Sequence, residues 1–222
     1  MLLLLFDIDG TLLQGAANEH AAALRAAAAA VHGLGALDGA VEVAGRTDRA
    51  IARDLLAHAG VTEPDPAWEV RAVAVYDPPD LTANVAPGIV ELLDALAARP
   101  DEFRLSLVTG NLEEIAHRKL GAAGLGHYFE PGQGGFGSDD EDRGRLPGIA
   151  RGRASNPPWP RERTVVIGDT PRDIHCARVD EVRVAAVATG HFSVEELAEA
   201  DAVVDDARSL LPVLTDWARP SA

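Results

Sequence analysis

The sequence has 222 residues, of which 47% are hydrophobic, and a formal net charge of -15 at pH 7. This length suits one large domain or two smaller ones, and the apolar share is enough for a buried core. The acidic balance argues against nucleic acid or an anionic membrane surface as a partner, because both attract basic patches. The single cysteine, Cys176, excludes an internal disulfide and favours a reducing, cytoplasmic location.

Short apolar runs alternate with amphipathic stretches along most of the chain. The expected strands are Leu2–Phe6, Arg104–Val108, Thr164–Ile167 and Val182–Val187. The first run lacks the basic flank and the length of a signal peptide. The expected helices are Gly88–Ala98, Leu112–Ala123, Ile174–Val179 and Val194–Ala200, with Asn111 and Ser193 as N-caps of the second and the fourth. This alternation predicts an α/β fold with a parallel sheet.

Residues 15–81 break the alternation, because no strand is expected there. Three helices are predicted instead, at Ala21–Val31, Asp48–Ala59 and Ala67–Tyr76, the second capped by Thr47. The proline-rich "YDPPD" at 76–80 looks like a boundary. We therefore expect a helical cap domain at 15–81, inserted into a Rossmann-like core formed by 1–14 and 82–222. The glycine-rich Gly132–Gly137 and the acidic Asp139–Asp142 are interpreted as loops.

Two aspartates, Asp7 and Asp9, follow the first expected strand directly. Side chains alternate along a strand, so both would project the same way if the extended geometry continued. They lie at the carboxyl end of the strand, where open parallel sheets bind ligands. Carboxylates this close need a cation or a shared proton to neutralise them. Taken alone, they could also be a simple acidic turn.

Two later stretches repeat this design. The segment "LVTGN" at 107–111 ends a strand on Thr109 and Gly110, and "VIGDTPRD" at 166–173 ends another on Asp169 and then Asp173. Each could be an ordinary strand-to-helix turn in which the polar residue is only a cap. All three turns are nevertheless expected at the same edge of the sheet, and a common site explains them better than three separate caps do.

The motifs "FDIDGTL", "LVTGN" and "VIGDTPRD", in this order and spacing, resemble those of the haloacid dehalogenase-like hydrolase superfamily. The helical insert after "DGTLL" resembles the C1 cap of that family, and the likeness covers essentially the whole chain. It implies a Rossmann-like core with a mobile cap and, in most members, Mg²⁺-dependent phosphatase activity. Among its members, the sequence is most similar to phosphoglycolate phosphatase-like proteins.

The resemblance also implies roles for individual residues. Asp7 would be the nucleophile that forms an aspartyl-phosphate, and Asp9 the general acid and then the general base. Thr109 would bind a phosphoryl oxygen at a helix N-terminus. The metal would be held by Asp7, the backbone carbonyl of Asp9, Asp169 and Asp173.

The remaining contacts to the substrate are expected from glycine backbone and from polar side chains of the loops. The candidates are Gly10, Gly110, Asn111, Arg46 and Thr47. Gly10 would permit the tight turn after the two aspartates. Arg46 and Thr47 belong to "VAGRTD" at 43–48, which either faces the site or serves only as the start of a helix.

The family usually places a lysine between the second and the last motif, beside the nucleophile. Lys119 is the only lysine of the chain, but it lies inside the helix after Gly110 and is expected to be too early in the sequence. Arg143 is the first choice for this position and Arg145 the second, although either could be a solvated loop residue. We therefore expect an Arg143→Ala change to be damaging and a Lys119→Ala change to be nearly silent.

Asp9 separates the reactions known in the family. Dehalogenases of this family have its motifs but lack the second aspartate, so the presence of Asp9 argues against that reaction. A phosphonatase needs a lysine in the cap, and residues 15–81 contain no lysine. The sequence therefore predicts a hydrolase of small phosphorylated metabolites. A phosphomutase, or a silent phosphate- or metal-binding regulator, stays open as an alternative. The sequence does not indicate an oligomeric state.

Overall fold

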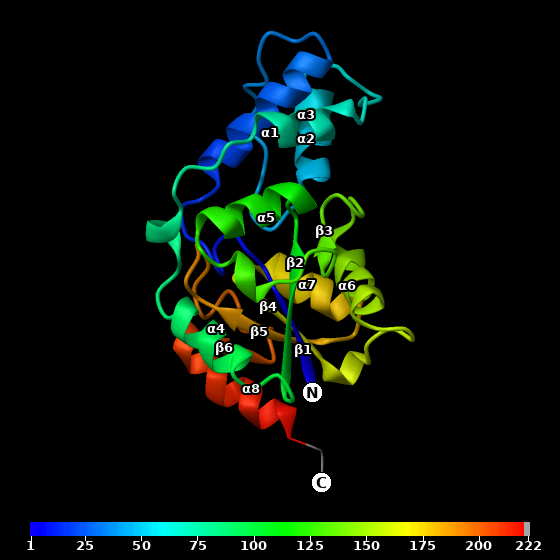
Figure 1. The fold of residues 1–222 in the computed structure, drawn as a ribbon. Helices are drawn as coiled ribbons and strands as arrows, with labels where there is room; N and C mark the ends of the chain where they lie inside the picture. The colour runs from blue at the N-terminus through cyan, green and yellow to red at the C-terminus, as the bar shows by residue number, and fades with distance from the viewer. Residues whose placement is uncertain (220–222) are drawn as a thin grey trace.

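A six-stranded parallel sheet forms the centre of the protein in a computed structural model that describes residues 1–219 (Figure 1). The strands are β1 (Leu2–Phe6), β2 (Phe103–Thr109), β3 (Gly135–Phe136), β4 (Thr164–Gly168), β5 (Arg183–Val187) and β6 (Ala202–Val204). Their order is β3-β2-β1-β4-β5-β6, so the chain reverses its direction of travel between β1 and β4. Open α/β sheets bind ligands at this kind of switch point.

Helices cover both faces of the sheet. One hydrophobic cluster joins the sheet to α4 (Ile89–Ala97), α5 (Glu113–Ala122) and α8 (Leu210–Ala218), and a second joins it to α6 (Leu146–Ala154) and α7 (Pro171–Val179). Side chains of β1 alternate between the two clusters, because successive residues of a strand point to opposite faces. The expected Rossmann-like α/β fold is confirmed.

Three further helices lie beyond the carboxyl ends of the strands, at the top of Figure 1. They are α1 (Asn18–Val31), α2 (Asp48–His58) and α3 (Ala67–Val75), and they share a third hydrophobic cluster. The helices match the sequence prediction, and the Thr47 hydroxyl caps α2 by accepting from the Ala50 N–H at 3.2 Å. That 15–81 is a domain of its own stays a prediction.

Two short strands were not predicted from the sequence. β3 lies within the supposed loop Gly132–Gly137, and it pairs with the last two residues of β2. Glycine disfavours strands on its own, but Gly135 lies against α6 so closely that a Cβ would stand 2.2 Å from the Leu146 carbonyl oxygen. β6 is a three-residue edge strand without a fully buried side chain, and its apolar run of three residues between Asp201 and Asp205 is too short to predict a strand.

Two details of the helix prediction are wrong. Residues 194–200 form turns and a bend instead of a helix, although Leu197 is buried in the second hydrophobic cluster. Seven residues offer few hydrogen bonds to offset the cost of starting a helix. Asn111 is not an N-cap, since α5 begins at Glu113 and has Leu112 at its N-cap position. The Leu112 N–H is instead satisfied by a carboxylate from α2, that of Asp48, at 2.7 Å.

None of the helices within residues 1–219 is long and apolar enough to cross a bilayer.

Candidate active site

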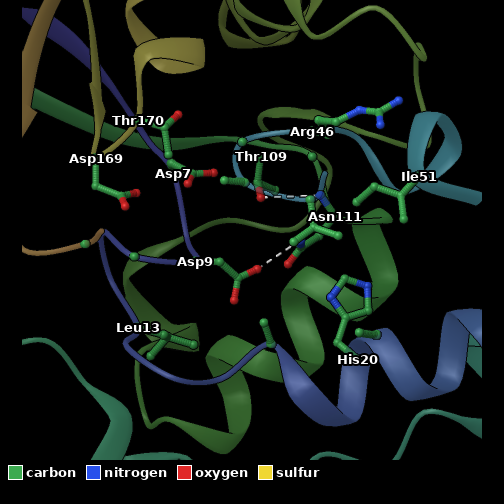
Figure 2. Close-up of a pocket in the computed structure, with 18 of the residues that line it drawn as sticks. Asp7, Asp9, Leu13, His20, Arg46, Ile51, Thr109, Asn111, Asp169 and Thr170 are labelled. Carbon is green, nitrogen blue, oxygen red and sulfur yellow. Dashed lines mark hydrogen bonds between the residues drawn. The ribbon is translucent and has the colours of Figure 1, made fainter. Parts of the chain in front are cut away.

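A cavity of about 500 Å³ lies over the carboxyl ends of β1, β2 and β4 (Figure 2). One side of the cavity, called the floor here, carries the charged residues that follow these strands, together with Arg143 and Lys119. The opposite side, called the roof, is formed by α1, α2 and the loop at 43–46. The floor and the roof come from segments far apart in the sequence, so only the folded chain brings them together.

Three buried carboxylates meet in the floor. One ligand oxygen each from Asp7, Asp169 and Asp173 lies within 4.8 Å of the others. Burial raises the pKa of Asp7 to about 7, and the charges of Asp173 and Asp9 add to this shift while Arg143 opposes it. Burial likewise raises the pKa of Asp169 to about 8, with further contributions from Asp7 and Asp173. Asp7 and Asp169 therefore ionise at a higher pH than an exposed aspartate does.

The surroundings of the three carboxylates fit a hard divalent cation. The donor set is all oxygen, which Mg²⁺ prefers. Two glycines lie directly against the Asp169 carboxylate. A Cβ atom added to Gly10 would stand 2.1 Å from an Asp169 oxygen, and one added to Gly190 would stand 1.9 Å from it. The Thr11 hydroxyl donates to Asp169 at 3.1 Å, which fixes the direction of that carboxylate. The expected metal ligands Asp7, Asp169 and Asp173 are therefore brought together in the structure.

Arg143 supplies the positive charge beside Asp7. Its Nη2 lies 3.0 Å from Asp7 Oδ1, and it also donates to Asp173. The side chain is buried, and both carboxylates raise the pKa of the guanidinium. Arg145, the second candidate, is exposed to 69% and pairs with Asp140 in the loop. The structure therefore places Arg143, and not Arg145, beside Asp7.

Asp9 also has a cation of its own, which the sequence analysis missed. The Lys119 Nζ donates to both carboxylate oxygens of Asp9, at 2.8 and 2.7 Å, and the lysine side chain is completely buried. The Asn111 amide donates to the same carboxylate at 3.0 Å. Although burial acts in the opposite direction, the charge of Lys119 holds the pKa of Asp9 below its usual value.

The expectation that Lys119 lies outside the site is therefore wrong. The position of Lys119 in the sequence did not indicate its place in the fold, because α5 begins just after β2 and brings Lys119 next to Asp9. A signal was present: the buried residues of α5 are Ile115, Ala116, Lys119 and Leu120, so the lysine lies on the apolar stripe of the helix. A lysine is almost never fully buried unless it is paired with an acidic group.

The turn after β2 places the other expected residues of the floor. Thr109 is buried, and its hydroxyl accepts from the Asn111 N–H at 3.4 Å. Asn111 is 7% exposed, and its Oδ1 has no hydrogen-bond partner within the described residues. Gly110 allows the roof to approach, since a Cβ there would stand 2.0 Å from the Arg46 carbonyl oxygen. All three residues line the cavity.

Asp48 of α2 ties the roof to the floor. Its backbone N–H donates to the Gly110 carbonyl at 2.8 Å, and its carboxylate receives the Leu112 N–H and lies 2.9 Å from the His20 ring of α1. His20 in turn makes an edge-to-face contact with Tyr76. Neither His20 nor Asp48 was singled out from the sequence, because both lie in helices that read as packing elements.

The two expected roof contacts lie apart from the carboxylates. The Arg46 guanidinium pairs with Asp54 at 2.8 Å and turns away from Asp7 in Figure 2. The Thr47 hydroxyl caps α2 and donates to the Glu141 carbonyl at 2.8 Å, and Thr47 does not line this cavity. A substrate role for Arg46 and Thr47 stays a prediction.

Comparison with known proteins adds the family. A family model described as haloacid dehalogenase-like hydrolase matches residues 4–178, and a second, HAD-hydrolase-like, matches 147–210. No curated protein matches the chain.

Solved structures resemble the chain over nearly its whole length. β-Phosphoglucomutase from Clostridium difficile has a TM-score of 0.68 and 18% identity, covering 98% of this chain and 97% of that chain. A predicted phosphoglycolate phosphatase from Haemophilus somnus has a TM-score of 0.65 and 19% identity, with 95% and 96% covered. CbbY from Rhodobacter sphaeroides, in complex with phosphate, has a TM-score of 0.62 and 22% identity, with 97% and 100% covered. Identities this low show a shared fold.

Proposed function

The chain belongs to the haloacid dehalogenase-like hydrolase family, and on this premise we propose that it is a Mg²⁺-dependent phosphomonoester hydrolase in which Asp7 is the nucleophile. The observation that carries the proposal is the group of Asp7, Asp169 and Asp173 with the Arg143 guanidinium beside Asp7. Asp9 stands two residues away with its own cation. This arrangement combines a nucleophile, a metal site and an acid–base group at one edge of the sheet.

In the first step, a carboxylate oxygen of Asp7 attacks phosphorus, and the bond from phosphorus to the ester oxygen breaks. The leaving oxygen takes a proton from Asp9, so the alcohol departs neutral. In the second step, water attacks the phosphorus of the aspartyl-phosphate and gives its proton to Asp9. Phosphate is released, and Asp7 is restored. Arg143 holds Asp7 in place and balances its charge throughout.

The pairing of Asp9 with Lys119 bears on both steps. Lys119 favours the ionised form of Asp9, so the first step draws on the minor, protonated form of this carboxyl group and leaves it ionised. Asp9 is then in the form that the second step needs, ready to accept a proton from water. Asn111 adds a second hydrogen bond, so the direction of the carboxylate is fixed from two sides. A fixed acid–base group loses less entropy on reaching the transition state.

Asp7, Asp169 and Asp173, with the backbone carbonyl of Asp9, are the groups that would hold Mg²⁺. The bound metal would supply positive charge that lets an anionic substrate approach the carboxylates and stabilises the charge on the transferring group. The closeness of the three carboxylates supports this assignment, because burial and their mutual repulsion, which raise the pKa of Asp7 and Asp169, are effects that a bound cation would offset.

The alternatives fit the roof and the floor less well. A phosphomutase must hold a second phosphate away from Asp7, yet the Arg46 guanidinium of the roof is paired with Asp54. A silent regulator that only binds phosphate or metal has no need of Asp9, and still less of a buried lysine that orients it. Both observations favour hydrolysis.

Phosphate release by the purified protein tests the proposal. A panel of phosphate monoesters is assayed with Mg²⁺ and with excess chelator. We expect release of inorganic phosphate with Mg²⁺, loss of activity with chelator, and recovery when Mg²⁺ is added back. Full activity in chelator would contradict the metal site, and isomerisation of a sugar phosphate without phosphate release would indicate a mutase.

A further inference from the structure

The roof of the cavity is apolar where it faces Asp9. α1 contributes Ala21 and Leu24, α2 contributes Ile51 and Leu55, and Leu13 closes the side after β1. Leu24 and Ala21 are three residues apart and Ile51 and Leu55 four apart, so each pair lies on one face of its helix. In Figure 2, the Ile51 side chain extends from α2 toward the middle of the site.

Most polar side chains around this part of the cavity bond other protein groups, and the exceptions within the described residues are Asn18 and Asn111 Oδ1. His20 and Asp48 bond each other, and Asp48 also holds the Leu112 N–H. Gln14 Nε2 donates to the Thr189 carbonyl at 2.8 Å, and Arg46 pairs with Asp54. A ligand with several hydroxyl groups would bury most of them here without matching partners, which is costly.

Arg25 is the one roof residue whose charge has no carboxylate partner among the described residues. Its Nη1 donates to the carbonyl oxygens of Leu37 and Gly39, at 2.5 and 3.1 Å. These bonds tie α1 to the loop that leads to 43–46. We assign Arg25 to holding that loop and not to the ligand.

We propose that the ester bound here is the phosphate of an uncharged, largely apolar alcohol, with its phosphate on the floor and its aliphatic or aromatic part against Leu24, Ile51 and Leu55. This inference rests on the proposed function, since it identifies the alcohol that leaves past Asp9. A volume of about 500 Å³ lies in the range of small-molecule sites. Val43 at the rim is 52% exposed, which fits an apolar side chain that a ligand covers.

A series of n-alkyl phosphates tests this. Ethyl, butyl and hexyl phosphate have leaving groups of nearly equal acidity, so the chemistry is constant and only the buried apolar area changes. We expect kcat/KM to rise about fourfold for each added methylene group until the cavity is filled. Hexyl phosphate should then exceed glucose 6-phosphate. A flat series, or a preference for the sugar phosphate, would overturn the inference.

Variants locate the effect in the roof. Ile51→Asn should flatten the chain-length series, measured as the ratio of hexyl to ethyl phosphate in the same variant, so a general loss of activity does not disturb the result. Ile51→Leu should keep the slope. Val70→Asn is the matched control, because Val70 is 75% exposed on α3 and does not line the cavity. An unchanged slope in Ile51→Asn would contradict the proposed position of the alkyl chain.

Two further measurements separate this inference from the proposed function. Acetyl phosphate has a small leaving group that needs no proton, so its hydrolysis reports on the floor alone, and failure with Mg²⁺ would count against the function. Hexylphosphonate and ethylphosphonate, compared by calorimetry, test the roof without turnover, and tighter binding of the longer one is expected. A preference for an alkyl phosphate with a terminal carboxylate would overturn the uncharged alcohol and give Arg25 an anion-binding role.

Discussion

The floor and the roof of the cavity differ in how they use charge. In the floor, each acidic group that could do chemistry has a cation or a hydrogen bond directed at it, as Arg143 is at Asp7 and Lys119 at Asp9. In the roof, polar groups such as His20 and Asp48 bond other protein groups, and apolar side chains remain for the ligand. Under the proposed function, the floor would perform the reaction and the roof would select the alcohol.

Removing the nucleophile tests the floor most severely. An Asp7→Asn variant keeps the shape of the side chain, but its amide is a very poor nucleophile. We expect turnover of all phosphate esters to fall by at least about 10,000-fold, whatever the alcohol. Phosphate release by the purified variant measures this, and a thermal melt checks that it is folded. A loss of turnover confined to the esters of some alcohols would mean that Asp7 selects the substrate and is not the nucleophile.

Arg143 comes next in expected effect. Arg143→Ala should lower kcat/KM by about 100- to 1,000-fold, because Asp7 and Asp173 lose the cation between them. Arg143→Lys should recover part of the loss, since the charge returns without the planar geometry. Arg145→Ala is the matched control, as Arg145 is exposed and lies only two residues away. If Arg145→Ala were the damaging change and Arg143→Ala harmless, the assignment of the floor cation would be wrong.

The floor was largely predictable from the sequence, whereas the roof was not. Asp7, Thr109 and Asp169 lie at the ends of short, continuously apolar runs, so the pattern of a strand buried on both faces and the parallel-sheet rule bring them together. The roof contacts depend on how α1 and α2 pack over the sheet, and no local pattern encodes that. Lys119 lies between these cases, because its place on an apolar stripe signals a buried partner but does not say which one.

The pairing of Lys119 with Asp9 gives a third prediction. Lys119→Met keeps the length of the side chain and removes the charge, so Asp9 loses the two bonds that orient it. We expect kcat/KM for alkyl phosphates to fall about 10- to 100-fold, and that for nitrophenyl phosphate to fall less, because nitrophenolate leaves without a proton. This replaces the expectation from sequence that a change at Lys119 is silent. Equal losses for both esters would point to a purely structural role.

A double variant sharpens that test. If Lys119 acts through Asp9, then Lys119→Met should cost little further activity in an Asp9→Asn background. Additive losses would mean that the lysine has a separate role. Thermal melts of the four proteins show whether loss of the buried charge pair has also lowered stability.

The smallest expected effect is the change that Mg²⁺ makes to the stability of the folded protein at different pH values. The pKa values of Asp7 and Asp169 are raised to about 7 and about 8, so the metal-free folded protein binds more protons than the unfolded chain between about pH 4 and 8. Its stability from these groups therefore falls as the pH rises through that window. Mg²⁺ binds the ionised carboxylates, so the increase in Tm that it causes should grow from pH 5.5 to 8.5.

At a concentration about 100 times its Kd, Mg²⁺ adds about 2.7 kcal/mol, which corresponds to about 5–11 °C for a chain of this size. Asp169→Asn serves as the control, because it removes a ligand and one of the two titrating groups, and it should abolish most of the pH-dependent gain. Melts with Mg²⁺ and with chelator across the pH range measure both quantities. A Mg²⁺ effect on Tm that is the same at every pH would mean that the metal binds away from these carboxylates, and the floor would then lose its place as the metal site.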